Sequence, residues 1–156
     1  MRRSCATQCS VQGESHMTLD ASKTIHSYLQ ALLNGGDFGR YFSDDVAWTT
    51  METGDQVHGR EAVRDYILAL HTQLFDAHPE VKSVTIGETT AALEADFVGT
   101  HTGEFAGIPP TGAALRVPYC VVYDLADDGI RALRAYIPVG LMVTQLQTAA
   151  AARAQL

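Results

Sequence analysis

Apolar side chains recur at helical spacing in two parts of this chain. Ile25, Leu29 and Leu32 share one face after the capping-type residues 18–22, which predicts a helix that stops before residues 34–37. A second stripe of apolar residues consists of Val63, Ile67, Leu70 and Leu74, and it predicts a second helix from residue 60 to about residue 75. A short helical turn is expected between them, over residues 38–42.

The remaining segments have the pattern of β-strands. They are rich in apolar, β-branched and aromatic residues, are bounded by Gly and Pro, and cover residues 46–50, 80–87, 90–102, 113–124 and 130–138, with a short hairpin at 54–59. Helices followed by a run of antiparallel strands predict one α+β domain with a six-stranded sheet over residues 18–148. Residues 1–17 are polar and aperiodic, which predicts a flexible N-terminal tail, and the alanine-rich residues 149–156 predict a C-terminal tail.

Composition narrows the classes of function. The chain has 156 residues, a net charge of −7 and no basic run beyond Arg2–Arg3, which argues against nucleic acid as a partner. No apolar stretch approaches the roughly 20 residues that a membrane helix needs. Cys5, Cys9 and Cys120 lack metal-ligand spacing and predict free thiols in a reducing cytoplasm. No Gly-rich phosphate loop is present and no His/Asp/Glu cluster has metal-like spacing, so no cofactor and no metal are expected.

The segment between the two longest predicted strands is the most distinctive part of the sequence. It reads GTHTGEFAGIPPTG over residues 99–112 and resembles the equivalent segment of the SnoaL-like polyketide cyclases. The resemblance continues through Asp127–Ile130 and Tyr136 to Gln145–Leu146. It implies a nuclear transport factor two-like cone, in which a curved sheet wraps around a long helix and encloses an apolar pocket. It also implies a cofactor-independent cyclase or isomerase that acts by acid–base chemistry on a hydrophobic, oxygenated polyketide-type metabolite.

The carboxylates that related cones use for catalysis are absent from this chain. The SnoaL-like pattern places its catalytic Asp at Pro138. The ketosteroid isomerase pattern places its base at Thr50 and its oxyanion-hole Asp at Cys120, and the epoxide hydrolase pattern places its late Asp near Ala135. Acid–base work needs a titratable group within reach of the substrate, so any catalysis here requires other residues.

Alternation along the strands predicts which side chains line the pocket. Cys120 and Val122 share a face with Arg116, Pro118 and Asp124, and this face is expected to form the pocket wall. The expected substrate-binding residues are Trp48, Thr50, Cys120, Val122, Pro138 and Met142. The opposite face would then form an exposed apolar patch that a homodimer covers, made of Val117, Tyr119, Val121 and Tyr123.

Four titratable residues are the candidates for catalysis: His71, His101, Asp96 and Tyr136. A histidine or a raised-pKa carboxylate would act as the base, and the tyrosine would donate a hydrogen bond to a developing oxyanion. Each has a structural alternative. His71 fits a helix-end histidine, His101 a hydrogen-bonded loop anchor, Asp96 an outward-facing carboxylate and Tyr136 a core residue. Two other functions remain open: an epoxide hydrolase or hydroxylase-type accessory enzyme, and a non-catalytic small-molecule-binding dimer.

Overall fold

The computed structural model describes residues 20–155, which contain three α-helices. Helix α1 (Ala21–Leu33) begins where the Asp20 carboxylate accepts a hydrogen bond from the Lys23 N–H at 2.9 Å. Helix α2 (Arg60–Ala69) continues into a π-helical turn, η2 (Leu70–Leu74), and α3 (Val139–Ala154) follows the last strand. A short 3₁₀ helix, η1 (Phe38–Tyr41), follows α1. None of the helices in the described part of the chain is long and apolar enough to cross a membrane.

Six strands in the described residues form one curved sheet. They are β1 (Phe42–Thr50), β2 (Gln56–His58), β3 (Phe75–Ile86), β4 (Thr90–His101), β5 (Ala114–Ala126) and β6 (Gly129–Tyr136). Their order across the sheet is β2-β1-β6-β5-β4-β3, and every neighbouring pair is antiparallel except β1 with β6. The α+β architecture expected from the sequence, with a six-stranded curved sheet packed on helices, is confirmed, and α3 is a helix in addition to the two predicted.

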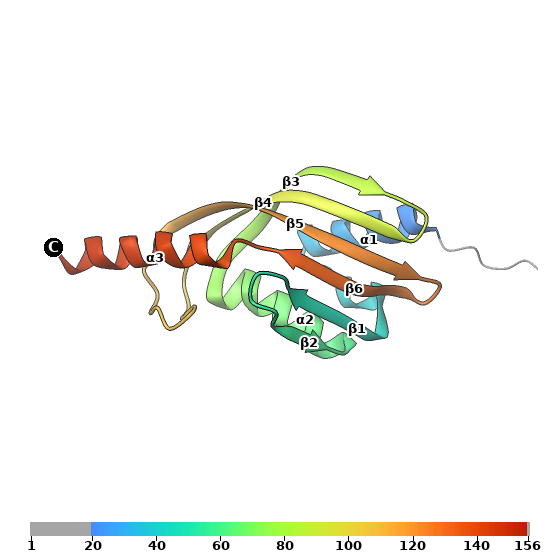
Figure 1. Cartoon of the computed structure of the whole chain (residues 1–156), viewed down its shortest axis with the longest axis horizontal. Helices are drawn as coiled ribbons and strands as arrows, with labels where there is room; N and C mark the ends of the chain where they lie inside the picture. The colour runs from blue at the N-terminus through green and yellow to red at the C-terminus, as the bar shows by residue number, and fades with distance from the viewer. Residues whose placement is uncertain (1–19, 156) are drawn as a thin grey trace, which may run out of the picture.

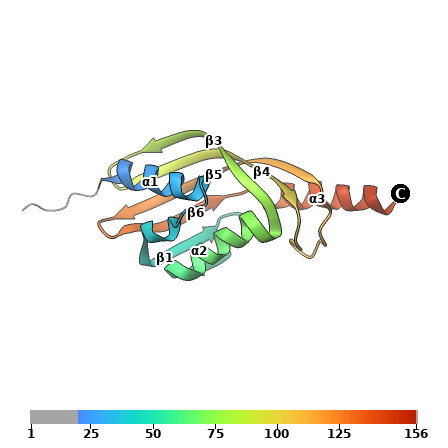
Figure 2. The same cartoon turned by 180° about the vertical axis from the view of Figure 1, so that it is seen from behind.

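The two faces of the sheet differ in what covers them. Helices α1 and α2 lie over one face, as Figure 2 shows, and α3 runs away from the end of the sheet (Figure 1). The buried side chains of β5 point toward α1 and α2 and include Val117, Val121 and Tyr123. We call this the inner face and the opposite side the outer face. Burying the inner side chains is the main term that stabilises the fold.

The sequence-based assignment of the two faces is wrong. Val117, Tyr119, Val121 and Tyr123 lie on the inner face, where three of them are less than 4% exposed. The apolar patch that was expected to form a dimer interface is therefore part of the core of this chain. Homodimerisation stays a prediction without that support.

Three boundaries differ from those expected. Strand β1 starts at Phe42, and β3 starts at Phe75, where the sequence pattern predicted helix in both cases. Residues 149–154 continue α3 rather than leaving it. The predicted N-terminal tail, residues 1–17, lies outside the described residues, as do Cys5 and Cys9.

Candidate functional site

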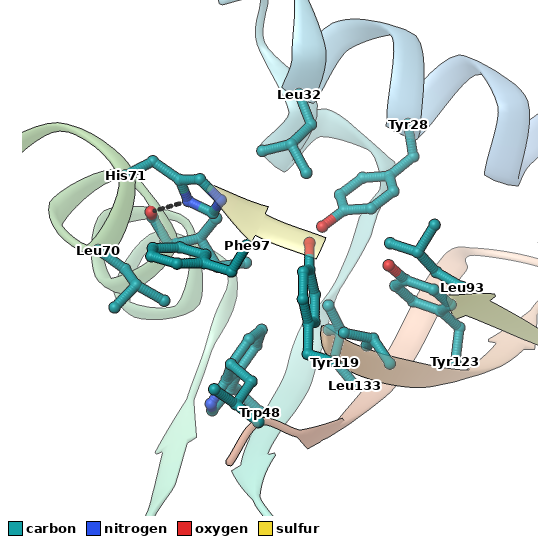
Figure 3. A pocket seen from close by; sticks show the side chains of 13 residues that line it. Tyr28, Leu32, Trp48, Leu70, His71, Leu93, Phe97, Tyr119, Tyr123 and Leu133 are labelled. Carbon is teal, nitrogen blue, oxygen red and sulfur yellow. Dashed lines mark hydrogen bonds between the residues drawn. The ribbon is translucent and has the colours of Figure 1, made fainter. Parts of the chain in front are cut away.

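A small apolar cavity lies between the inner face of the sheet and the helices α1 and α2 (Figure 3). Its walls are Tyr28 and Leu32 from α1, Trp48 from β1, Ile67, Leu70 and His71 from α2 and η2, and Leu93, Phe97, Tyr119, Val121, Tyr123, Leu133 and Ile137 from the other strands and the residue that follows β6. The cavity volume is about 30 Å³. A water molecule needs roughly 10–15 Å³ measured in this way, so the cavity holds about two waters and no larger molecule in this conformation.

Three tyrosines contribute hydroxyl groups to the wall of the cavity. Figure 3 shows the hydroxyls of Tyr28 and Tyr119 pointing toward one another, with Tyr123 on the neighbouring stretch of β5. Burial raises the pKa of Tyr28, Tyr119 and Tyr123 above the usual tyrosine value. All three therefore stay protonated near neutral pH and can donate hydrogen bonds to an oxygen inside the cavity.

His71 is the titratable residue that faces these hydroxyls from the helical side. Its Nδ1 lies 2.7 Å from the carbonyl oxygen of Ile67, one turn earlier, so Nδ1 carries a proton and donates it to that oxygen. The other ring nitrogen, Nε2, is buried and has no hydrogen-bond partner. Burial lowers the pKa of His71, and the Ile67 carbonyl partly opposes this effect. The neutral ring thus presents an unshared electron pair at the cavity wall.

The π-helical turn sets the position of that ring. His71 follows Ile67 by four residues, so both side chains lie on the face of the helix that meets the sheet. The turn ends at Leu74, whose carbonyl oxygen accepts hydrogen bonds from the N–H groups of Thr102 at 3.1 Å and Gly103 at 3.0 Å. The segment after β4 therefore holds the end of η2, and only a glycine fits at position 103, because a Cβ there would overlap the carbonyl oxygen of Gln73.

His101 lies outside the cavity and anchors the loop that follows β4. The side chain is fully buried, and its Nδ1 accepts a hydrogen bond from the Thr111 N–H at 3.2 Å and lies 3.0 Å from the Thr111 hydroxyl. Its ring lies 5.4 Å from the ring of Phe75, and burial lowers the pKa of His101. These contacts fit the structural alternative for this residue, a loop anchor. Its Nε2, like that of His71, is buried without a hydrogen-bond partner, but His101 does not line the cavity.

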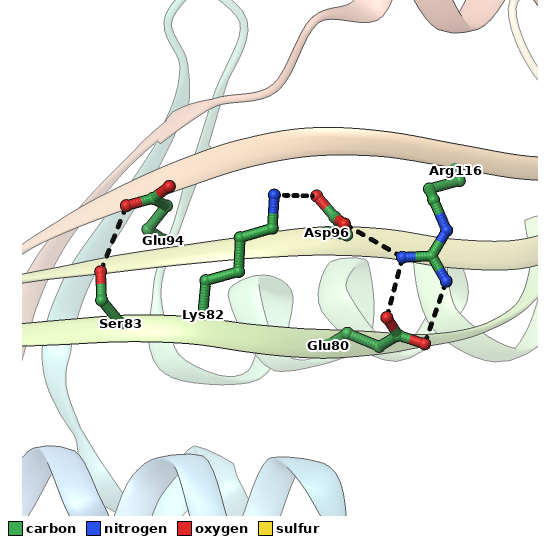
Figure 4. Close-up of polar contacts among 6 residues, drawn as sticks. All are labelled: Glu80, Lys82, Ser83, Glu94, Asp96 and Arg116. Carbon is green, nitrogen blue, oxygen red and sulfur yellow. Dashed lines mark hydrogen bonds and ion pairs between the residues drawn. The ribbon is translucent and has the colours of Figure 1, made fainter.

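Asp96 lies on the outer face, in a network of ion pairs (Figure 4). Its carboxylate is 2.9 Å from Lys82 Nζ and 3.0 Å from the Arg116 guanidinium, which also contacts Glu80 at 2.8 Å. Hydrogen bonds from Lys82 and Arg116 hold the pKa of Asp96 below its usual value. The network joins β3, β4 and β5 on the side of the sheet away from the cavity, so the structure does not bring Asp96 together with His71.

The expected substrate-binding residues divide between the two faces. Trp48 lines the cavity, as expected, and its indole N–H donates to the Thr50 hydroxyl at 3.0 Å. Cys120 is paired with Tyr136, which is 49% exposed, and both lie on the outer face with Val122, so their assignment to the pocket is wrong.

The two remaining expected residues belong to the start of α3. Pro138 precedes the helix as its N-cap residue, and Met142 is buried one turn later. Neither lines the cavity, although Ile137, next to Pro138, does. Among the described residues, no Asp or Glu lines the cavity, and no group of His, Cys, Asp and Glu is arranged to hold a metal ion.

The family of this chain follows from a comparison with known sequences. A model of the SnoaL-like polyketide cyclases matches residues 23–146. The chain belongs to the SnoaL-like polyketide cyclase family. No curated protein matches it. Members of this family are generally cyclases.

Solved structures of the SnoaL-like type share the fold. A presumed polyketide cyclase from Xanthomonas campestris is 18% identical with a TM-score of 0.71, over 81% of this chain and 96% of that one. A presumed SnoaL-like polyketide cyclase from Jannaschia sp. CCS1 is 20% identical with a TM-score of 0.71, over 85% of this chain and 95% of that one. AclR, a presumed hydroxylase from Streptomyces galilaeus, is 19% identical with a TM-score of 0.67, over 83% of this chain and 86% of that one. These similarities show the nuclear transport factor two-like fold.

Sequence reasoning missed the tyrosines of the cavity. Tyr28 follows Ile25 by three residues and precedes Leu29, so helical periodicity alone places it on the buried face of α1. Tyr119 and Tyr123 share one face of β5 with Leu115, Val117 and Val121, and this apolar row marks the inward face.

Proposed function

We propose that this SnoaL-like protein catalyses a cofactor-independent isomerisation or ring closure of a neutral, apolar, oxygenated metabolite, with His71 as the base. The observation that carries the proposal is the unpartnered His71 Nε2 in the wall of a cavity that also holds tyrosine hydroxyls. An unsatisfied buried acceptor is unfavourable for stability, and such atoms concentrate at functional sites.

In the proposed reaction, Nε2 removes a proton from a carbon next to a substrate carbonyl. The carbonyl oxygen gains the negative charge of an enolate, and the tyrosine hydroxyls of Tyr28 and Tyr119 donate hydrogen bonds to it. The ring becomes an imidazolium, whose Nδ1–H keeps its hydrogen bond to the Ile67 carbonyl. The proton then returns to another carbon in an isomerisation, or to the new alkoxide when the enolate carbon has attacked a second carbonyl.

The charge of the site indicates the kind of ligand it accepts. None of the cavity-lining residues is an Asp, Glu, Lys or Arg. A ligand carboxylate or phosphate would lose its hydration without gaining a counter-charge, which is strongly unfavourable in an apolar cavity. A ketone, ester or phenol would lose much less hydration free energy and could accept hydrogen bonds from the tyrosine hydroxyls. The proposed substrate is therefore neutral.

Deuterium exchange into a simple ketone tests the proposed base without knowledge of the natural substrate. We would incubate the protein with 2-tetralone, a neutral bicyclic ketone, in deuterated buffer and follow loss of the α-proton signals by NMR. The wild type should accelerate exchange above the buffer rate. His71→Gln, which keeps a polar side chain in the wall, should lower this acceleration about 10²–10⁴-fold, the usual contribution of a general base.

His58→Gln is the matched control, since His58 is an exposed histidine on β2. It should exchange at the wild-type rate. Equal rates in wild type and His71→Gln would remove His71 from the mechanism. A wild type that binds the ketone but does not accelerate exchange would favour the alternative of a non-catalytic binding protein.

A further inference from the structure

A surface groove adjoins the cavity on the far side of Leu32 and His71. It lies between the end of α1, the residues 35–38 that follow it, the end of α2 and the start of β3, and its volume is about 220 Å³. Its walls are Leu32, Leu33, Gly35, Gly36, Phe38, Ile67, Leu68, His71, Thr72, Ala77, His78 and Pro79. Leu32, Ile67 and His71 line both the groove and the cavity, so these three side chains form the partition between them.

We infer that this groove is the access route and the outer half of the ligand site, and that Leu32 is the residue whose side chain controls passage into the cavity. The inference rests on the proposed function, because it takes the ligand to be neutral, apolar and oxygenated. The cavity alone has room for about two water molecules, whereas the groove is several times larger and touches the same histidine. A multi-ring ligand can therefore reach His71 only if most of its body stays in the groove or if the partition moves.

The lining of the groove matches that ligand. Like the cavity, the groove has no Asp, Glu, Lys or Arg in its walls. Leu33 and Leu68 contribute to its walls and are 45% and 40% exposed, which leaves both side chains available to contact a ligand. The groove also has polar atoms in its walls, from Thr72 and His78. The occupant is thus a molecule with an apolar body and a few neutral oxygen atoms.

Leu32 is the movable part of the partition. Ile67 is 2% exposed and fixed in the core, and His71 is held by its hydrogen bond to the Ile67 carbonyl. Leu32 is only partly buried and lies in the last turn of α1, close to Gly35, whose φ of +71° marks the chain reversal after the helix. A rotamer change of this one side chain would connect groove and cavity without breaking a hydrogen bond.

The test uses Prodan, 6-propionyl-2-(dimethylamino)naphthalene, a neutral ketone whose emission shifts to the blue in apolar surroundings. Trp48 is the single tryptophan of the chain and lines the cavity, so its emission reports on binding in the same sample. The wild type should bind Prodan with a blue shift and a loss of Trp48 emission. Leu33→Lys and Leu68→Lys, which place a charge in the groove wall, should each weaken binding about tenfold or more.

Leu141→Lys is the matched control, because Leu141 is also 45% exposed and lies on α3, outside the groove. It should bind Prodan as the wild type does. Leu32→Ala should raise the rate constant for quenching of Trp48 by acrylamide severalfold, and Leu32→Phe should lower it, with circular dichroism confirming that both variants fold.

Several results would overturn the inference. Wild-type affinity for Prodan in both groove variants, no binding to the wild type up to the solubility of the probe, or unchanged acrylamide quenching in Leu32→Ala would each show that the groove is not the route. These outcomes do not depend on turnover. If the wild type does not accelerate ketone exchange but its Prodan binding depends on the groove residues, the proposed function is rejected and the groove still stands as the access route.

Discussion

Substituting Gly103 by alanine should destabilise the protein and disturb the proposed base together. Gly103 packs against the backbone at the end of η2, and an added Cβ would overlap the Gln73 carbonyl oxygen and lie 3.1 Å from the Cα of Leu74. Backbone atoms cannot move aside by changing rotamer, so either the loop after β4 or the turn that carries His71 must shift. The substitution therefore tests whether this contact positions the histidine.

The size of the effect follows from two contributions. Overpacking a tight contact costs about 1–3 kcal/mol of unfolding free energy. A shift also weakens the hydrogen bonds from the Thr102 and Gly103 N–H groups to the Leu74 carbonyl, at 3.1 and 3.0 Å, each of which contributes about 0.5–1.5 kcal/mol. We expect a loss of about 2–5 kcal/mol, or roughly 5–15 °C in the melting temperature of a domain of this size.

Urea unfolding followed by Trp48 emission measures this loss. Gly36→Ala is the matched control, because an added Cβ there meets its nearest atoms at an ordinary contact distance of 3.4 Å. The control should change the unfolding free energy by less than about 0.5 kcal/mol. At temperatures where Gly103→Ala stays folded, its ketone exchange should fall well below that of the wild type. Equal stability of the two variants would refute the argument that the loop and η2 are in tight backbone contact.

Three further predictions concern pH, the outer face and the core. Burial lowers the pKa of His71 and His101, so the unfolded chain binds protons more readily than the folded chain. The unfolding free energy should therefore be at its full value above pH of about 6.5 and fall as the pH is lowered. Urea titrations at a series of pH values should show a smaller fall in His71→Gln, and an equal fall would contradict the placement of His71 as a buried, neutral histidine. Asp96→Asn and Tyr136→Phe should keep wild-type ketone exchange, because both residues lie on the outer face. A large loss of exchange in either variant would indicate that the catalytic site lies on the outer face. Leu133→Ala should lower the unfolding free energy by about 2–5 kcal/mol, since this side chain is 1% exposed, and a loss below about 1 kcal/mol would contradict its place in the core.

Periodicity in the sequence was enough to predict the architecture. The stripe of Val63, Ile67 and Leu70 does face the sheet, and the strands that follow have the expected order and sense. The predicted ends of helices and strands are wrong where local helix preference competes with strand pairing in the folded protein. Phe75 continues a helical stripe in the sequence, but its ring packs against Phe97 at 5.3 Å and its backbone pairs with His101, so it belongs to β3.

The site was predicted less well, and β5 shows why. Its alternating apolar residues, Val117 and Val121 among them, are the pattern of an inward-facing row. The row with Cys120 and Val122 was expected to face the pocket, and because side chains alternate along a strand, choosing the wrong row reverses both faces. His71 was a candidate because it lies at the edge of an apolar helical stripe, and it does line the cavity. The groove that adjoins it could not be found, since it is formed by residues far apart in the sequence.

The parallel pairing of β1 with β6 has a consequence for the synthesis of this protein. Strand β1 is synthesised before β2–β5, whereas β6, with Leu133, is synthesised after all of them. Until then the chain cannot close the sheet, and the indole of Trp48 and the ring of Phe42 have no neighbouring strand on that side. Contacts between such distant segments fold slowly and leave apolar surface exposed in the meantime. We therefore expect nascent or truncated chains that end before residue 129 to depend on chaperones, whatever the stability of the finished protein.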